Sequence, residues 1–324
     1  MSALNNASYF KLIRILADGN CHSEKNLSQT LGINRATISQ HIKKLQQWGL
    51  EVLQAQSKGY YLLAPLDLLS EAVLRKKLHV PEFTLVPVID STNQYLLDRI
   101  GQLTSGMSCL AEYQHAGRGR RGGVWFSPFC ANLCFSIYWK LDASITAAMG
   151  LSLVVGVAMV EVLAKLGTEG VKVKWPNDLY WQDKKLAGIL IEMTGQAGDA
   201  IHLVIGVGLN IAMSDKCDVD QNWVNLKDTS NTLPGKNILA AALINGVIDA
   251  LKKYEINGMI GFVEQWNKYD NFQNRSVKLL LEKFETQGIV RGINEQGALL
   301  LETETGIIPY LSGKISFRAN SQIM

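Results

Sequence analysis

The chain has 324 residues, 47% of them hydrophobic and 19% charged, which is typical of a globular protein with two or three domains. No apolar run reaches about 18 residues, and the first residues lack a basic segment followed by an apolar core, so we expect neither a membrane span nor export. The net charge of +3 is unevenly placed, because residues 1–63 hold seven Lys or Arg but three Asp or Glu, a net charge of +4. This asymmetry predicts a basic N-terminal module with an anionic partner.

The N-terminal part of the chain carries the pattern of three short helices. Apolar residues recur at helical spacing over 8–17, Ser23 can cap a second helix, and a third helix is predicted over 35–48. Gly32 lies in the short turn between the second and third helices, and Gly49 ends the third. A helix-turn-helix module is therefore predicted.

The third predicted helix leaves one face polar. Its residues are of the types that contact phosphates and base edges in DNA: Asn34, Arg35, Thr37, Gln40, His41 and Lys44. Two β-prone runs, 51–54 and 59–63, predict a small hairpin, or wing, that places Lys58 near a phosphate. DNA binding is favoured over a protein-contact role, although His41 taken alone is more often a plain surface histidine.

The five cysteines are scattered along the chain: Cys21, Cys109, Cys130, Cys134 and Cys217. Cys130 and Cys134 have no second pair and no histidine cluster nearby, so we predict no zinc site and no other metal held by the protein. Buried free thiols in a reducing cytoplasm are the expected state of all five.

After an amphipathic connecting helix predicted over 66–78, the chain changes character. Strands are predicted over 83–89, 107–113, 132–140, 172–174, 179–181, 186–193 and 201–211. Helices are predicted over 92–100, 147–166, 239–254 and 259–268. Short strands with few long helices predict an α+β domain built on a mixed sheet. The chain lacks a P-loop motif and a complete dinucleotide-binding motif.

The most informative stretch is residues 117–123, Gly-Arg-Gly-Arg-Arg-Gly-Gly, with Gln114 before it and Trp125 after it. Glycine lets backbone N–H groups approach a ligand closely, and arginine supplies a planar donor group suited to phosphate or carboxylate. Alone, this arginine loop is as compatible with a solvated basic loop as with one that orders around an anion.

Three further segments support a site. Ser91-Thr92-Asn93 begins a predicted helix, where Ser91 can cap the helix and also contact a ligand. Residues 174–178, Lys-Trp-Pro-Asn-Asp, put a lysine and a carboxylate at a strand end, although a structural turn with a solvent-facing lysine is the alternative. In 184–192 a lysine enters a buried strand in which one glycine leaves room for something to lie on the strand. The glycines with this expected role are Gly188 and, in the next strand, Gly206 and Gly208.

From about residue 271 the pattern becomes a series of short strands separated by glycines. They are predicted over 276–282, 288–294, 298–303, 307–311 and 315–318. A small β-barrel is expected from this pattern.

Three motifs in this order and spacing resemble those of the biotin–protein ligase family: Gly-Arg-Gly-Arg-Arg-Gly at 117–122, Lys-Trp-Pro-Asn-Asp at 174–178 and Lys-Leu-Ala-Gly-Ile-Leu at 185–190. With the helix-turn-helix module, the whole chain is similar to the bacterial bifunctional form, which is both a biotin–[acetyl-CoA-carboxylase] ligase and a repressor of the biotin operon. The resemblance implies an α+β multidomain fold. Its expected parts are a winged helix-turn-helix domain over 1–65, a class II synthetase-like ligase domain over 66–270, and an SH3-like barrel over 271–324.

The resemblance also implies a two-step reaction: biotin and ATP form biotinyl-5′-AMP and pyrophosphate, and a lysine of the biotin carboxyl carrier protein then takes the biotin. Mg²⁺ accompanies the ATP. By similarity, Lys185 bridges the carboxylate and the α-phosphate, Arg118 supplies charge, Asp178 orients the acceptor lysine, and Trp125 stacks on the adenine. The other residues expected to bind biotin or the adenylate are Ser91, Thr92, Asn93, Gln114, Gly117, Gly119, Arg120, Lys174, Asn177, Gly188, Gly206 and Asn210.

Two departures from the family pattern stand out. Relatives of this type often continue the arginine loop with basic residues, whereas this chain has Gly123-Val124, which we expect to soften retention of the adenylate. The segment 213–224, with Trp223, corresponds to a second ligand-ordered loop and is slightly short.

The resemblance further implies operator DNA of biotin synthesis genes as a partner, a homodimer that forms on adenylate binding, no membrane partner, and a cytoplasmic location. Two other functions stay open at this point. One is a lipoate–protein ligase, which shares the domain type. The other is a non-catalytic transcription regulator that senses biotin.

Overall fold

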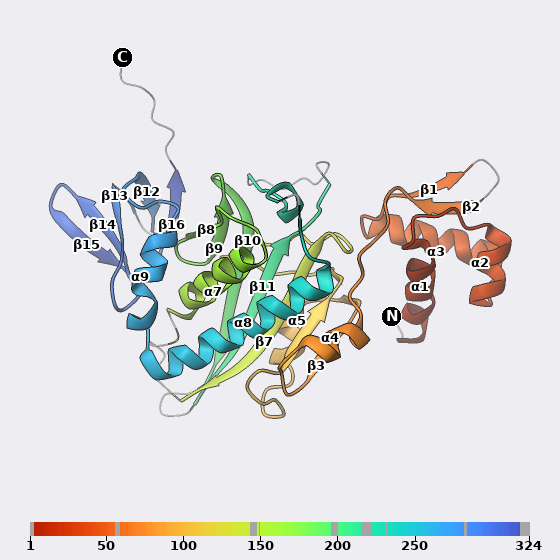
Figure 1. The fold of residues 1–324 in the computed structure, drawn as a ribbon, viewed down its shortest axis with the longest axis horizontal. Coiled ribbons are helices and arrows are strands. Elements are labelled where there is room, and N and C mark those ends of the chain that lie inside the picture. Colours follow the sequence, from red (N-terminus) through yellow and green to blue (C-terminus); the bar gives the residue numbers. More distant parts are fainter. Residues whose placement is uncertain are drawn as a thin grey trace, which may run out of the picture.

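The computed structural model describes residues 3–55, 59–142, 148, 150–195, 200–214, 222–230, 232–281 and 284–317. Three parts follow one another along the chain, and Figure 1 shows them side by side, with the N-terminal module at one end and the C-terminal strands at the other. Among the described residues, no helix is both long and apolar enough to cross a membrane.

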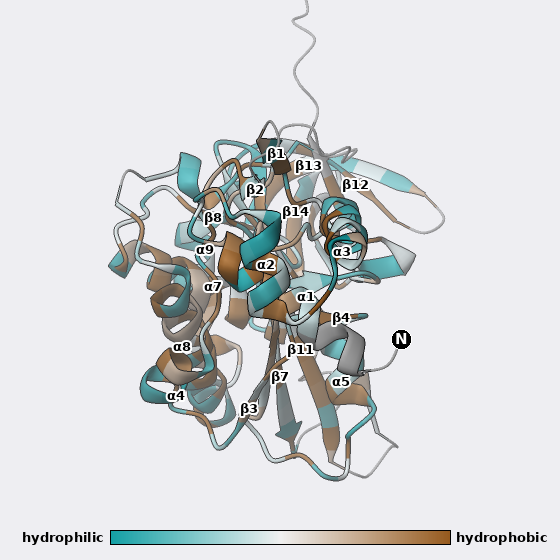
Figure 2. Cartoon of the chain, turned by 90° about the vertical axis from the view of Figure 1, so that its right-hand side faces the viewer, coloured by the Kyte–Doolittle hydropathy of each residue, from teal (hydrophilic) through white to brown (hydrophobic). Residues whose placement is uncertain are grey.

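The N-terminal module consists of three helices and a hairpin. Its elements are α1 (Ala3–Leu16), α2 (Glu24–Leu31), α3 (Arg35–Gln47), β1 (Val52–Ala55) and β2 (Gly59–Leu62), the two strands pairing antiparallel. The predicted helix-turn-helix with a wing is therefore present. Figure 2 shows hydrophilic and hydrophobic colours on different sides of α2 and α3, as expected of helices with one buried face.

Local side-chain hydrogen bonds set where these helices begin. The Oγ of Ser23 accepts the Asn26 N–H at 3.1 Å, and the Oδ1 of Asn34 accepts the Thr37 N–H at 2.9 Å. Both satisfy backbone donors that a first helical turn leaves without partners. Gly32 ends α2 with φ of +66°, a left-handed conformation that favours glycine. The turn between the two helices is thus determined locally.

The central part is built on a seven-stranded sheet with strand order β3-β5-β7-β11-β10-β9-β8. Its first pair, β3 and β5, is parallel and the remaining neighbours are antiparallel, so the predicted mixed sheet is confirmed. The strands are β3 (Phe83–Leu85), β5 (Ser108–Ala111), β7 (Asn132–Leu141), β8 (Lys172–Lys174), β9 (Asp178–Trp181), β10 (Lys184–Thr194) and β11 (Ile201–Asn210). A separate parallel pair is formed by β4 (Val88–Ile89) and β6 (Tyr113–Gln114).

Helices cover both faces of this sheet (Figure 1). One face packs against α7 (Leu151–Lys165), and α7 packs in turn against α8 (Lys236–Asn257). Gly156 of α7 faces Val173, Leu179 and Ile189 on three adjacent strands, where a Cβ would make ordinary contacts. The other helices are α4 (Glu71–Lys77), α5 (Thr92–Leu97) and α9 (Ile260–Tyr269), of which α5 packs against β5, β7 and β11.

Two sequence predictions in this part were too long. The helix expected over 66–78 is limited to α4, because the N–H of Leu69 binds Glu112 Oε1 at 2.5 Å and that of Ser70 binds Asn237 Oδ1 at 2.7 Å. Those donors are fixed by tertiary contacts rather than by a helix. The strand expected over 83–89 divides into β3 and β4 on either side of Pro87, which has no N–H for a ladder.

The C-terminal part is a five-stranded antiparallel sheet with strand order β15-β14-β13-β12-β16. The strands are β12 (Ser276–Leu280), β13 (Glu285–Ile293), β14 (Leu299–Thr303), β15 (Gly306–Tyr310) and β16 (Lys314–Phe317). The central domain holds this sheet through several polar contacts. Arg275 reaches Asp183 with two hydrogen bonds of 2.7 and 3.0 Å, and the indole N–H of buried Trp175 donates to the Gly297 carbonyl at 3.1 Å.

Aromatic side chains join the N-terminal module to the central domain. Trp48, at the end of α3, stacks on Phe129 with ring centroids 6.0 Å apart and an interplanar angle of 12°, and it also stacks on Tyr113. The Phe129 N–H donates to the Trp48 carbonyl at 2.9 Å. Phe129 therefore belongs to the hydrophobic core of the N-terminal module although it lies in the central domain.

The prediction for the cysteines was partly wrong. Cys109, Cys130 and Cys134 are buried free thiols, as expected, but Cys21 is exposed in the turn between α1 and α2. Burial raises the pKa of the three buried thiols to about 11 or 12, so they stay protonated at neutral pH. Cys217 lies outside the described residues.

Asp270, between α9 and the C-terminal sheet, gives the fold a dependence on pH. Burial raises the pKa of its carboxyl to about 7, against the opposing effect of the Phe272 N–H that it accepts at 2.9 Å. A raised folded-state pKa favours the protonated acid, so the stabilisation is present below about pH 4 and is lost as the pH rises to about 7.

We expect Asp270→Asn to remove this dependence, since an amide does not titrate. The wild type should lose roughly 4 kcal/mol of unfolding free energy relative to the variant between pH 4 and pH 8, measured by denaturant unfolding at each pH. Asp249→Asn on the exposed face of α8 is the control. A difference between wild type and Asp270→Asn that is constant with pH would contradict the account.

Candidate active site and DNA-binding surface

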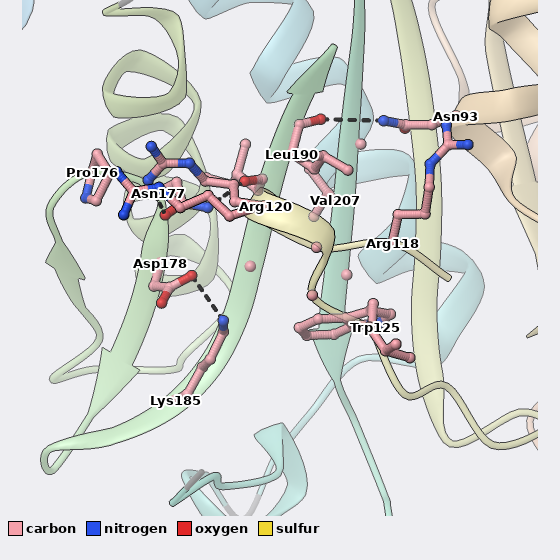
Figure 3. Close-up of a pocket in the computed structure, with 18 of the residues that line it drawn as sticks. Asn93, Arg118, Arg120, Trp125, Pro176, Asn177, Asp178, Lys185, Leu190 and Val207 are labelled. Carbon is pink, nitrogen blue, oxygen red and sulfur yellow. Dashed lines mark hydrogen bonds and ion pairs between the residues drawn. The ribbon is translucent and has the colours of Figure 1, made fainter. Parts of the chain in front are cut away.

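A cavity of about 420 Å³ lies over β9, β10 and β11, and four segments distant in sequence line it. Figure 3 shows the labelled side chains gathered from α5, the arginine loop, the turn before β9 and β10. The lining brings together these residues that the sequence predicted: Ser91, Thr92, Asn93, Gln114, Arg118, Gly119, Arg120, Trp125, Lys174, Asn177, Asp178, Lys185, Gly188 and Gly206. Two predicted residues, Gly117 and Asn210, lie outside the lining.

Glycines form the floor, but the chain's own side chains cover it. A Cβ on Gly208 would lie 2.2 Å from the ring of Trp125, and a Cβ on Gly206 would lie 2.2 Å from the Asn93 side chain. Gly188 pairs with Gly208 across the sheet and also faces Trp125. The glycines thus leave room on the strands, as predicted, and all three line the cavity. They leave the space in which Trp125 and Asn93 lie, and those two side chains face the cavity.

The start of α5 is tied to the strand before the arginine loop. Ser91 caps the helix by accepting the Gln94 N–H, and the N–H and hydroxyl of Thr92 both donate to Gln114 Oε1, at 2.8 and 3.1 Å. The hydroxyl of buried Ser136 donates to Thr92 Oγ1 at 2.7 Å and also contacts the side chain of Asn93. These bonds fix the orientation of three polar side chains at the cavity wall.

The arginine loop is a small hairpin closed by its own backbone. The Gly119 N–H donates to the Gly123 carbonyl at 2.7 Å and the Trp125 N–H to the Gly117 carbonyl at 2.9 Å. Its tip is a short turn, η1 (Arg120–Gly122), in which Arg121 has φ of +52°. A Cβ on Gly117 would lie 2.5 Å from the Trp125 carbonyl oxygen, so Gly117 is required by the hairpin and not by the cavity.

Arg118 is held by a carboxylate, Glu192, that was not predicted from the sequence. Its guanidinium binds Glu192 Oε2 at 2.8 Å and Gln94 Oε1 at 2.6 Å, and the Asn93 amide also donates to Glu192, at 2.8 Å. Figure 3 shows Arg118 reaching towards Asn93. Strand alternation could have indicated Glu192, because it lies on the same face of β10 as Gly188.

Lys185 and Asp178 form an ion pair at the opposite wall. Their Nζ and Oδ1 atoms are 2.9 Å apart, and both side chains are mostly buried, with 20% and 16% of their surface exposed. Figure 3 shows the two side chains pointing toward each other from adjacent strands. The Lys185 ammonium also lies 5.7 Å from the centre of the Trp125 ring. Nearby, Arg120 donates to Asn177 Oδ1 at 3.3 Å.

Lys174 does not face solvent, so the alternative of a structural turn with a solvent-facing lysine was wrong. Its ammonium donates to the Tyr180 hydroxyl at 2.9 Å and lies over the Tyr180 and Phe272 rings. Burial, together with repulsion from the neighbouring Lys185 and Lys314, lowers its pKa to about 8 against the attraction of Asp178. Positive charge is therefore concentrated here.

The charge of the whole lining is strongly unbalanced. Its described residues include six cationic side chains, Arg118, Arg120, Arg121, Lys174, Lys185 and Lys314, but a single carboxylate, Asp178. Such a cavity is suited to a ligand with several negative charges. Arg121 and Lys314 were not predicted from the sequence, and Lys314 reaches the cavity from the C-terminal sheet.

Asn210 was predicted to bind the ligand, but it is buried behind the cavity. Its amide donates to the carbonyls of Lys185 and Val224, at 3.3 and 3.4 Å, and its Oδ1 accepts from Asn132. The segment around Trp223 also pairs with the backbone of Lys185. Asn210 thus fixes the strand that carries Lys185. Residues 215–221 of this second loop lie outside the described part.

The donor set does not form a metal cage of its own. Within the described ranges, no group of three or more His, Cys, Asp or Glu side chains is placed to hold a metal ion. Asp178, the single lining carboxylate, is paired with Lys185. A divalent cation would therefore be held mainly by the phosphate oxygens of a nucleotide, which is how Mg²⁺ commonly enters such sites.

The predicted DNA-binding face is present on α3 with one correction. Asn34, Arg35 and Gln40 are exposed, and Thr37 and Lys44 are half-buried at its edge. His41 is buried, because its ring packs 4.0 Å from that of Tyr9 on α1, and burial lowers its pKa. It belongs to the core of the module and not to the groove-facing surface. Lys58 lies outside the described residues.

The chain matches the biotin/lipoate A/B protein ligase family over residues 85–210, the biotin protein ligase C-terminal domain over 272–318, and an HTH domain over 10–61. It is 50% identical over 317 residues to the bifunctional ligase/repressor BirA of Escherichia coli (strain K12), which covers 97% of this chain and 98% of that protein. The biotin protein ligase of Aquifex aeolicus in complex with biotin and ATP superimposes with a TM-score of 0.63 at 26% identity, covering 74% of this chain and 99% of that chain.

A helix-turn-helix module joined to a mixed-sheet domain with a cationic cavity defines a DNA-binding protein that also holds an anionic ligand. The chain belongs to the biotin/lipoate A/B protein ligase family. The family and the fold class predicted from the sequence are thereby confirmed.

The contact between Gly208 and Trp125 can be tested without a ligand. Gly208→Ala places a methyl group within the ring of Trp125, so we expect the indole to be displaced and the unfolding free energy to fall by about 1–3 kcal/mol. The measurements are denaturant unfolding and the indole N–H resonance of Trp125. Gly156→Ala, whose Cβ makes ordinary contacts, is the control. An unshifted Trp125 resonance in Gly208→Ala would refute the contact.

Proposed function

We propose that this protein is an ATP-dependent biotin–protein ligase that also represses transcription of biotin synthesis genes. The observation that carries the enzymatic part is the cavity with six cations and one carboxylate, lined by the three motifs of the family. Biotin and ATP are both anionic, and so is the biotinyl-5′-AMP formed from them. Their mutual repulsion is the barrier that such a cavity lowers.

In the first step a carboxylate oxygen of biotin attacks the α-phosphorus of ATP. The bond from that phosphorus to the bridging oxygen breaks, and pyrophosphate leaves with its electron pair. We assign Lys185 to the position between the carboxylate and the α-phosphate, and Arg118 and Arg120 to the charge on the phosphoryl oxygens. Fixed cations of this kind stabilise the charge that spreads over a phosphoryl group in transfer. Mg²⁺ enters with ATP.

Arg118 must exchange partners during this step, because its guanidinium is paired with Glu192 and Gln94. Glu192 also holds Asn93, so the same carboxylate positions one group of α5 and one of the arginine loop. We assign Trp125 to a flat apolar contact with the ligand, because it lies on the cavity floor beside the Lys185 ammonium. Stacking on adenine remains the predicted form of that contact.

In the second step a lysine of the biotin carboxyl carrier protein, a subunit of acetyl-CoA carboxylase, attacks the mixed anhydride. Its amine displaces AMP and loses a proton. We assign Asp178 to orienting that amine, because its carboxylate lies in the cavity wall within 2.9 Å of Lys185, close to where the anhydride would lie.

The test is biotin-dependent exchange of labelled pyrophosphate into ATP, followed by transfer from added biotinyl-5′-AMP. Lys185→Met should slow exchange by roughly 10²–10³, because it removes a charge aimed at the transition state. Lys184→Met, an exposed neighbour on the same strand, is the matched control. Asp178→Asn should slow transfer from the adenylate more than it slows exchange.

Equal slowing of both steps by Asp178→Asn would contradict the role of Asp178 in orienting the amine. Normal exchange by Lys185→Met would contradict the role of Lys185 in forming the adenylate. Replacing biotin by lipoate in the wild-type assay tests the lipoate–protein ligase alternative. A wild type that binds biotin but produces no exchange would instead identify a non-catalytic regulator.

The second activity uses the exposed face of α3 on operator DNA. We infer a homodimer on the operator, because one helix-turn-helix per chain usually recognises a two-half-site sequence as a pair. In the proposed switch, biotinyl-5′-AMP is the corepressor and promotes the dimer. The protein would then work in the cytoplasm, where its carrier protein and chromosomal DNA are both within reach.

Operator binding should tighten when biotin and ATP are added together, measured by fluorescence anisotropy on DNA upstream of biotin synthesis genes. Arg35→Ala should weaken binding about tenfold, since a phosphate or base contact is worth roughly 1–3 kcal/mol, and leave pyrophosphate exchange unchanged. Glu51→Ala, exposed outside that face, is the control. Equal affinity with and without the two ligands would exclude the switch.

A further inference from the structure

Glu192 joins two residues that line the cavity, although it does not line the cavity itself. It lies on β10, and its Oε2 accepts hydrogen bonds from the Asn93 amide and from the Arg118 guanidinium, each at 2.8 Å. Asn93 belongs to α5 and Arg118 to the arginine loop. The ion pair is mostly buried, with 35% of the Arg118 side chain and 30% of the Glu192 side chain exposed. One carboxylate oxygen therefore connects helix, loop and sheet.

The amide of Asn93 is fixed on both of its polar atoms. Its Nδ2 donates to the Leu190 carbonyl at 3.3 Å as well as to Glu192, and its Oδ1 accepts the hydroxyl of buried Ser136 at 2.5 Å. Figure 3 shows the bond from Asn93 to Leu190, with Arg118 reaching towards Asn93. Asn93 is only 4% exposed, so loss of the Glu192 carboxylate would leave a buried N–H without a partner, which is costly.

Arg118 keeps hydrogen-bond donors for a ligand while it is paired. Its bonds to Glu192 and Gln94 use one N–H of each terminal nitrogen, and Asp98 orients Gln94 by accepting its amide at 2.6 Å. The Nε of Arg118 is buried and has no hydrogen-bond partner among the described residues. A guanidinium has five N–H donors, so the pair with Glu192 holds the side chain in place without using all of them.

The same ion pair holds the arginine loop beside the sheet. The hairpin closes on itself through its backbone, so its position over the cavity depends on what its side chains contact. At its base Trp125 lies on the floor glycines. Nearer the tip, Arg118 forms the 2.8 Å ion pair with Glu192, and Arg120 forms a longer bond of 3.3 Å to the neutral Asn177. A hydrogen bond between two charged groups is the stronger of these two ties.

We propose that Glu192 is a positioning residue that holds Arg118 and Asn93 in place for biotin. This inference rests on the proposed ligase activity and names a residue that acts through two lining groups without touching a ligand. Because loop and helix are already joined, biotin meets an ordered wall and does not have to order the loop itself. When the phosphates of ATP enter, Arg118 exchanges Glu192 for the phosphoryl charge, so the restraint acts on the binding of biotin and not on that of ATP.

Calorimetric titration with biotin alone measures this role. Glu192→Ala should bind biotin about tenfold more weakly than the wild type, the usual effect of losing one hydrogen bond to a charged group. Glu192→Gln keeps an oxygen that both donors can reach and should recover most of the affinity. Thr194→Ala, at the next exposed position on the same face of β10, is the matched control. Unchanged binding by Glu192→Ala, or equal weakening by Glu192→Gln and Glu192→Ala, would overturn the proposal.

Biotin-dependent pyrophosphate exchange separates positioning from a general loss of structure. Glu192→Ala should raise the KM for biotin by about tenfold. The KM for ATP should not rise and the rate at saturating biotin and ATP should not fall, because in the wild type Arg118 leaves Glu192 when the phosphates bind. Equal rises in the KM for biotin and the KM for ATP would contradict the positioning role.

Trypsin cleavage of the ligand-free protein keeps the test independent of the proposed activity. The arginine loop holds three arginines, after which trypsin cleaves. Cleavage in the loop should be about tenfold faster in Glu192→Ala than in the wild type or Thr194→Ala, because opening the loop no longer breaks the ion pair. Equal rates in all three proteins would overturn the proposal. A wild type whose loop is protected by Glu192 but which binds no biotin would contradict the ligase activity and leave the restraint on the loop standing.

Discussion

Mutual repulsion among six cations around one carboxylate is the constraint that the cavity must overcome. The protein meets it by placing the charges on separate rigid elements: the arginine loop, the end of β8, β10 and the start of β16. Each element is anchored by bonds that do not involve its charged groups, such as the loop backbone closure at Gly119 and the contact of Trp175 with the C-terminal sheet. Arg118 and Lys185 are already paired with Glu192 and Asp178, so an arriving anion competes with these two carboxylates.

Much of this architecture could be predicted from the sequence because its signals are local. Ser23 and Gly32 determine the helix-turn-helix through capping and a left-handed turn, which short-range patterns reveal. The motifs around Arg118, Lys185 and Asp178 are contiguous runs, and their resemblance to the motifs of one family assigned them to one site. Residues whose role is marked by a contiguous sequence pattern could therefore be predicted.

The remaining residues depend on long-range packing. His41 has the helical position of a groove contact, but Tyr9 of another helix covers it. Asn210 ends a strand that enters the site, yet its side chain points behind the strand that carries Lys185. Lys314 is 129 positions after Lys185, and only the docking of two sheets brings it to the cavity. Glu192 could have been predicted, since period-two alternation from Gly188 places it on the cavity face.

The aromatic contact between Trp48 and Phe129 limits the length of the chain between the cavity and the N-terminal module. Trp125 is fixed on the glycines of the cavity floor, and Phe129, four positions later, is fixed against Trp48 at the end of α3. One inserted or deleted residue in this stretch would pull one of the two anchors out of place. The number of residues between Trp125 and Phe129 is therefore as strictly determined as the identity of these two residues.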